Sequence, residues 1–331
     1  PDTSNPDGVD VLGNVIPVDG DTPPGLRISD GLKTEPLSES RQKIIAQKGG
    51  ELLWDQKTLI LKSQVVVKNV SASSGNIKFT GEVLIEGAVE SGVYIMAGTV
   101  KVRGLVGASL LSSETNIQVA EGVKGEGKAL LRAKKHIAVG FAERATLLAV
   151  GDLYVNKSLS FCRVMCNSKV VQKTPGGTLV GGLIKVKGGL VAHNLGSPNG
   201  VPTTISFGQD YLIEDQINAE VKETDKLREA IVKLDHLMLT LTGDSNKEKL
   251  AQARQKKVLM IKMLEKRNLK LINLRDKFDL HCPSEILIHE NIFPGVSIES
   301  HGRLFEVKTK KSRIKIVFNE NTGHIEEQSL E

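Results

Sequence analysis

The chain has 331 residues and a formal net charge of +5, and its 40% hydrophobic and 25% charged residues are typical of a folded protein rather than a disordered one. Aromatic residues make up only 4% of the chain while glycine occurs 32 times, which disfavours a compact core of large rings and favours a narrow core of aliphatic side chains. No apolar run is long enough to span a bilayer, no signal-peptide pattern is present, and three cysteines do not form a disulfide framework. We therefore expect a cytoplasmic protein. Because the chain starts at Pro1 rather than Met, we also expect it to be a fragment of a longer protein.

Residues 1–48 are rich in turn-forming residues, which predicts an irregular N-terminal segment wrapped against the rest of the chain. Within this segment, short apolar runs lie on both sides of Gly13-Asn14. Asn or Gly pairs between two apolar runs are typical of a two-residue β-hairpin loop, so a hairpin is predicted here.

Internal repeats dominate residues 49–208. Two loop residues followed by an aliphatic-x-aliphatic triplet recur along the chain, at Ile77-Lys78-Phe79, Val100-Lys101-Val102, Ile117-Gln118-Val119, Ile137-Ala138-Val139, Leu153-Tyr154-Val155 and Ile184-Lys185-Val186. Each triplet predicts a short strand with one buried face. The spacing of about 15 to 23 residues suits one coil of a parallel β-helix, in which equivalent strands of successive coils stack on one another. A strict six-residue period, as in left-handed helices, is lost at Lys101. Because crossovers between parallel strands are overwhelmingly right-handed, we predict a right-handed β-helix.

A second motif alternates with the first and has small residues at both ends. It places Ala129 with Ala133, Ala145 with Ala149, and Cys162 with Cys166. Since the two cysteines occupy positions that alanine fills in the other copies, we interpret all six as structural corner positions, with the thiols serving as small buried side chains.

Residues 209–280 change to a helical period, with apolar residues at heptad-like spacing on both sides of a turn at Thr242–Asn246. The first arm is mainly acidic and the second mainly basic, which favours their pairing. We predict an antiparallel coiled-coil hairpin inserted into the β-helix. After Pro283 the strand pattern returns, so residues 281–318 are expected to complete the solenoid, and residues 319–331 to form a frayed acidic tail.

No motif of catalytic, cofactor or metal chemistry stands out. Cys282, His289 and His301 are separated by seven and twelve residues, which matches no zinc pattern. The glycine pairs lack the Lys-Ser/Thr of a phosphate-binding loop, and acidic residues are scattered over many coils. The acidic arm should neutralise much of the basic one, and no aromatic residues accompany the basic arm, so nucleic-acid binding is not expected. We predict neither enzyme activity nor a bound metal or cofactor.

The order of motifs resembles that of one family, the flagellar assembly protein A (FapA) family. The resemblance rests on the opening stretch Asp7–Gly13, on Gly75–Val89 in the repeats, and on Gly181-Gly182 and Leu195–Gly208 before the helices. Residues Gly98–Gly104 are also similar to the β-helical domain of the division inhibitor MinC. The resemblance implies a right-handed β-helix with a coiled coil, an additional N-terminal domain in typical members, and a cytoplasmic bacterial role in flagellar assembly. No catalytic residue is implied.

Three functions fit these expectations. The first is a non-catalytic scaffold that binds flagellar or pole-organising proteins, with recruitment to the cell pole, through the β-helix and the coiled coil. The second is a self-assembling homo-oligomer, similar to MinC or to bactofilins, because the end coils of a solenoid carry unpaired strand edges. The third is a polysaccharide-active enzyme, since parallel β-helices often cleave polysaccharides. The binding face itself is not predicted by the sequence.

Overall fold

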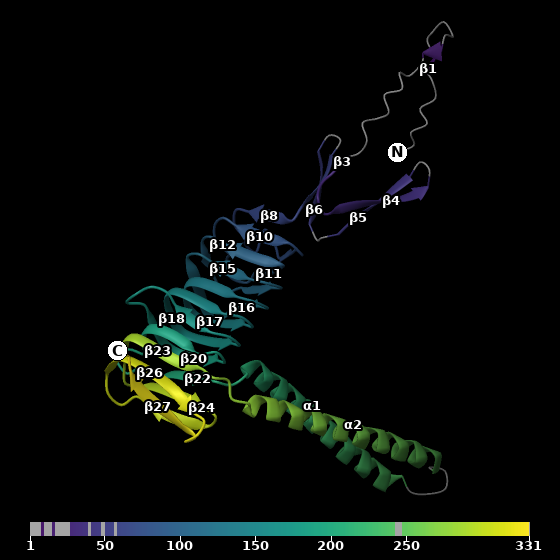
Figure 1. Ribbon diagram of the computed structural model, residues 1–331. Coiled ribbons are helices and arrows are strands. Elements are labelled where there is room, and N and C mark those ends of the chain that lie inside the picture. The colour runs from purple at the N-terminus through teal and green to yellow at the C-terminus, as the bar shows by residue number, and fades with distance from the viewer. Residues whose placement is uncertain are drawn as a thin grey trace.

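The computed structural model describes residues 8–9, 15–16, 27–38, 41–47, 50–55, 58–241 and 247–330. The protein is mainly β and forms a β-solenoid of about eight turns, from which a long helical hairpin projects near the C-terminal end (Figure 1). The predicted fold class, a parallel solenoid with an inserted helical hairpin, is confirmed. The handedness of the coil stays a prediction from the crossover rule.

Parallel strands of successive coils build the solenoid. In chain order they are β8 (Gln64–Val67), β9 (Ile77–Lys78), β10 (Glu82–Ile85), β11 (Tyr94–Ala97), β12 (Thr99–Val102), β13 (Leu105–Val106), β14 (Leu110–Ser113), β15 (Ile117–Val119), β16 (Gly122–Ala133), β17 (Ile137–Ala149), β18 (Leu153–Cys166), β19 (Val170–Gln172), β20 (Thr178–Val186), β21 (Leu190–Leu195), β22 (Thr203–Phe207), β23 (Glu285–Ile292) and β24 (Val296–Ser300).

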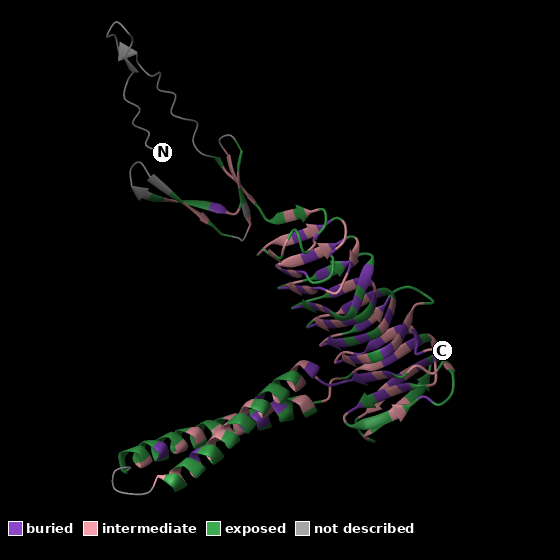
Figure 2. Cartoon of the chain, turned by 180° about the vertical axis from the view of Figure 1, so that it is seen from behind, coloured by how far each residue is buried: buried purple, intermediate pink, exposed green. Residues whose placement is uncertain are grey.

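Aliphatic side chains form columns along the interior because paired strands keep equivalent residues in register. One column runs through Val65, Val83, Val100, Ile117, Ile137, Leu153, Val170, Leu190 and Ile286. A second runs through Ile77, Ile95, Leu111, Leu131, Leu147, Val164, Ile184, Ile205 and Ile298. Apart from the first member of each column, these side chains are buried (Figure 2). The narrow aliphatic core explains the low aromatic content.

The N-terminal region departs from the expectation. β3 (Arg27–Ile28), β6 (Glu51–Asp55) and β7 (Thr58–Lys62) make a three-stranded sheet, and β4 (Leu32–Ser38) pairs antiparallel with β5 (Arg41–Ala46). These strands lie beyond the first coil rather than wrapped along it (Figure 1). The solenoid therefore begins at β8, not at residue 49, because β6 pairs antiparallel with β7 and leaves Trp54 65% exposed instead of adding a buried rung.

The predicted N-terminal hairpin corresponds to β1 (Gly8–Val9) and β2 (Val15–Ile16), which pair antiparallel. Its Gly13-Asn14 turn lies outside the described residues.

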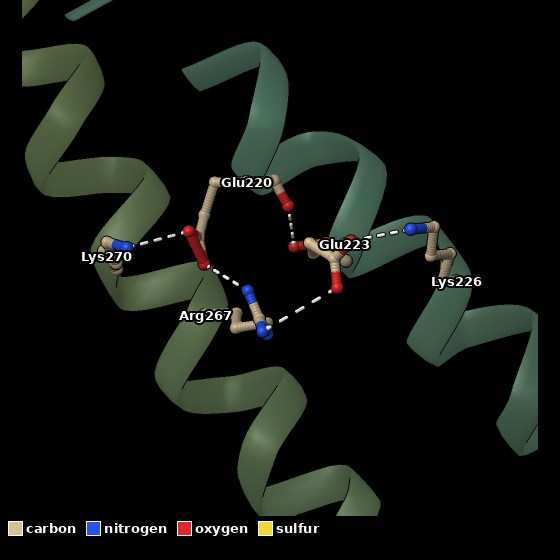
Figure 3. A network of polar contacts seen from close by, with 6 residues as sticks. Glu220, Glu223, Lys226, Arg267 and Lys270 are labelled. Carbon is tan, nitrogen blue, oxygen red and sulfur yellow. Dashed lines mark hydrogen bonds and ion pairs between the residues drawn. The ribbon is translucent and has the colours of Figure 1, made fainter. Parts of the chain in front are cut away.

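Two long helices form the hairpin, α1 (Tyr211–Thr240) and α2 (Lys247–Asp279). They lie side by side along their length (Figure 1), and the turn predicted at 242–246 falls outside the described residues. Asp210 is the N-cap of α1, since its carboxylate accepts the backbone N–H groups of Leu212 and Ile213. Ion pairs between the arms join Glu220 to Arg267 and Lys270 (Figure 3). A further pair joins Asp235 to Lys257. The opposite charges of the two arms thus meet across the hairpin.

The C-terminal strands complete and then cover the solenoid. β23 and β24 stack in parallel on β21 and β22, whereas β25 (Arg303–Glu306), β26 (Lys311–Asn319) and β27 (His324–Ser329) are antiparallel. The prediction that residues up to 318 add coils is therefore wrong after β24, because β26 turns back onto β23. The expected frayed tail is also wrong, since the backbone of β27 pairs with β26.

Candidate binding surfaces on the helical hairpin

Charged side chains fix the base of the hairpin to the solenoid. Lys187, directly after β20, lies with its Nζ 2.9 Å from Oδ2 of Asp210, and Lys185 within β20 pairs with Glu214. Asn167 adds a hydrogen bond of 3.2 Å to Asp210. Burial on its own would raise the pKa of Asp210, but the hydrogen bonds from Lys187 and Asn167 outweigh burial and lower that pKa. The ionised Asp210 therefore holds the start of α1 against the solenoid.

A cleft of about 560 Å³ lies beside this joint and is lined by Lys185, Tyr211, Glu214 and Glu299 among others. Burial raises the pKa of the Tyr211 phenol, and the charges of Glu299 and Glu214 add to this effect. The phenol is consequently protonated at neutral pH, and Glu214 is engaged by Lys185. We find no activated nucleophile in this arrangement of described residues.

The hairpin exposes an apolar stripe on one side of α2. Val258, Ile261, Leu269 and Ile272 follow a helical spacing and are 52%, 37%, 64% and 54% exposed. A groove of about 390 Å³ between the helices is lined by Val221 of α1 together with Ile272. These five residues define what we call the apolar face. Glu265 lies between Ile261 and Leu269 on this side and separates two apolar pairs. Exposed aliphatic side chains grouped in this way are typical of a surface that another protein covers.

The six small residues predicted at corner positions lie in two interior columns. Ala129 pairs with Ala145 and Ala133 with Ala149, while Ala149 in turn pairs with Cys166. Cys162 pairs with Gly182 of the next coil. All six side chains are buried.

Burial raises the pKa of both thiols, to about 11 for Cys166. A protonated, buried thiol is neither a nucleophile nor a metal ligand at neutral pH. The geometry of these cysteines is that of packing residues.

The three residues of the candidate metal set are not brought together. His289 lies beside His193, with ring centroids 5.4 Å apart, whereas His301 lies beside His281 at 5.0 Å. Within the part of the chain that the structure describes, no group of three or more His, Cys, Asp or Glu side chains could hold a metal ion. Sequence reasoning missed both histidine pairs, because each joins residues whose proximity depends on how the last strands fold over the solenoid.

Three acidic residues on the coils, Glu82, Glu86 and Glu114, pair with bases of neighbouring coils. Glu82 Oε2 lies 2.9 Å from Lys101 Nζ, and Glu114 pairs with Lys134. Exposed pairs of this kind contribute little to stability.

Comparison with known proteins decides the family. The model of the flagellar assembly protein A β-solenoid domain matches residues 63–323, which is most of the chain. The chain belongs to the flagellar assembly protein A family. The matched region starts at the first coil and ends within the C-terminal strands, so it includes the hairpin of this FapA family member. No curated protein and no solved structure shows significant similarity to the chain. Among the described residues, no helix is both long enough and apolar enough to span a membrane.

Proposed function

We propose that this protein is a non-catalytic cytoplasmic scaffold of flagellar assembly, and that its hairpin binds a protein partner through the apolar face. The family supports a role in flagellar assembly. The observation that carries the finer proposal is the apolar face itself, where Leu269 and Ile272 remain 64% and 54% exposed on a helix whose other side is packed against α1. Covering such side chains gains about 25 cal/mol for each Å² removed from water.

The anchoring of the hairpin suits this role. Because Lys185 and Lys187 hold Glu214 and Asp210, the apolar face is presented at a defined angle to a rigid solenoid. A preorganised surface loses less conformational entropy when a partner binds.

The test is complementation of a deletion strain of the native bacterium with a variant carrying Val258→Ser, Leu269→Ser and Ile272→Ser. We expect the number of flagella per cell to fall to that of the deletion strain at an unchanged protein level. The matched control carries Val150→Ser and Leu304→Ser, which alter exposed apolar side chains outside the hairpin. Wild-type flagellation of the apolar-face variant would overturn the proposal.

Self-assembly is the second candidate function. β26 turns back over the C-terminal end of the solenoid, whereas β8 of the first coil pairs only with β10 among the described strands. An unpaired edge of this kind is a template for another strand. Sedimentation velocity over a concentration series tests it, and a monomer at every concentration would exclude it.

A further inference from the structure

Lysine side chains line one side of α2 at heptad-like spacing. Positions on this side follow one another at alternating intervals of three and four residues, and they hold Lys249, Gln252, Lys256, Leu259, Met263, Lys266, Lys270, Asn273 and Lys277. Residues at these intervals share one face of a helix. None of these nine positions carries an acid. Glu248, one turn before Gln252, is the one acidic residue of α2 on this side, so the charge along the rest of it is positive.

Side chains of α1 extend the same surface. Leu237 of α1 lines a hollow of about 360 Å³ together with Lys249 and Lys256. Lys226 and Lys233 precede Leu237 at helical spacing and are exposed, so they lie on this side of the hairpin as well. We call the surface formed by these residues of the two helices the basic face. It lies on the opposite side of α2 from the apolar face.

Most of the charge on the basic face is not cancelled within the protein. Lys270 pairs with Glu220 and Lys226 pairs with Glu223, but both lysines stay more than half exposed. The other lysines have no ion pair with the residues described for the rest of the chain, namely Lys233, Lys249, Lys256, Lys266 and Lys277. The surface therefore attracts an anionic partner.

The amino-acid composition of the basic face indicates which class of anionic partner it suits. Arginine forms the bidentate bonds that recognise single phosphates, and aromatic rings stack on exposed bases. The exposed positions of the basic face contain neither, which disfavours a nucleic acid. Lysine acts as a point charge on a flexible stem and suits a diffuse anionic surface. Leu259 and Met263 are 62% and 51% exposed between the lysines, as in helices that place apolar side chains below lipid headgroups.

The length of the surface fits the same partner. From Lys249 to Lys277 the helix extends roughly 42 Å at the usual rise per residue. The lysines thus form a nearly straight line that a flat surface can contact along its whole length, whereas a small anion would engage only one or two of them.

We propose that the basic face of the hairpin binds an anionic lipid bilayer, with the lysines at the headgroups and Leu237, Leu259 and Met263 at the acyl boundary. The hairpin then lies on the membrane and turns its apolar face toward other proteins. The interaction is peripheral and reversible.

The test is co-sedimentation of the full chain with vesicles of phosphatidylcholine, with or without phosphatidylglycerol. We expect binding only to vesicles that contain phosphatidylglycerol, and weaker binding as added salt screens the charges. Replacing Lys256, Lys266 and Lys277 by glutamine should reduce the affinity about a hundredfold, since each lysine near an anionic surface contributes about a factor of five.

A matched control replaces Arg228, Arg254 and Arg275 by glutamine, which removes the same charge from the side of the hairpin that carries the apolar face. This variant should bind vesicles with less than about a threefold change, because these groups point away from the membrane. Both variants should keep the helical circular dichroism of the wild type, which shows that the hairpin has folded.

Equal loss in the two variants, or equal binding to vesicles without phosphatidylglycerol, would overturn the proposal. Binding of single-stranded RNA by the basic face without binding to vesicles would overturn it in favour of a nucleic acid. Vesicle binding is measured without any protein partner, so its failure is separable from a failure of the apolar face in the flagellation assay.

Discussion

Arg267 of α2 lies against Glu220 of α1, with its Nη1 2.6 Å from the carboxylate Oε1, and both residues occupy positions of the heptad seam that apolar residues hold elsewhere (Figure 3). Lys270 adds a second contact of 2.8 Å to the other carboxylate oxygen. A charged layer inside a mostly apolar seam fixes the register of two helices, because any slip would leave the charges unpaired.

Replacing Glu220 by leucine should therefore lower the thermal stability of the hairpin, since the guanidinium of Arg267 loses its main partner at the seam. The double replacement Glu220→Leu with Arg267→Leu should regain that stability but favour association of hairpins in other registers. Circular dichroism during heating measures the first effect and sedimentation the second. A single variant that melts like the wild type would contradict the assigned pairing.

The same layer predicts acid sensitivity. The hydrogen bond from Lys270, with a further one from Arg267, lowers the pKa of Glu220 below its ordinary value. A carboxyl group with a lower pKa in the folded state stabilises that state above its unfolded pKa of about 4.3, and this contribution disappears as the pH falls through the folded value. The hairpin should thus lose stability below about pH 4, and a Glu220→Gln variant should lose less.

Removal of the N-cap gives a local test of the joint. Asp210→Ala should destabilise α1 by about 1 kcal/mol through loss of the cap, and further through loss of Lys187. Asp210→Ser keeps a capping oxygen but loses the ion pair, which separates the two effects. Asp215→Ala on an exposed turn of the same helix is the control and should change the free energy of unfolding by less than about 0.5 kcal/mol.

Two glycines with similar backbones differ in what surrounds them. Gly176 and Gly182 have φ values of 72° and 77°, but a Cβ on Gly176 would meet no atom within 4 Å, whereas one on Gly182 would lie 2.1 Å from the carbonyl oxygen of Cys162. Gly176→Ala should cost about 1–2 kcal/mol from the left-handed backbone alone. Gly182→Ala should cost about 1–3 kcal/mol more, because neighbouring coils must move apart. Denaturant unfolding of both variants measures the difference, and equal losses would contradict the coil-to-coil contact.

The solenoid was predictable because its signal is local and repeated. Ile117, Ile137 and Leu153 each lie in the same short triplet, and the stacking of parallel strands brings the triplets together without further information. The end of the solenoid was not predictable in this way. The strand patterns of β24 and β26 look alike in sequence, yet β24 pairs in parallel and β26 antiparallel, since the direction of a strand depends on the connection before it and not on its own residues.

The candidate surfaces likewise differ in how far the sequence predicts them. The heptad spacing of apolar residues in α2 predicted which side of the helix packs against α1. The lysine row follows the same spacing on the outer positions, so it could have been predicted from those positions as well. The anchoring of Asp210 by Lys187 was not foreseeable, because it joins a helix start to a strand whose outward residues carry no signal of a partner.

Thiol labelling tests the interior columns directly. Cys162 and Cys166 are buried and their thiols have raised pKa values, whereas Cys282 is partly exposed. In the native protein an aromatic disulfide reagent should therefore react with no thiol other than Cys282, and all three should react in denaturant. A Cys282→Ser variant should leave the native protein unreactive, while a Cys166→Ala variant should keep the native reaction of the wild type and remove one thiol from the denatured count. Rapid native labelling of Cys162 or Cys166 would mean that these side chains face solvent, and the columns through Ala145 and Ala149 could not then be in the register described above.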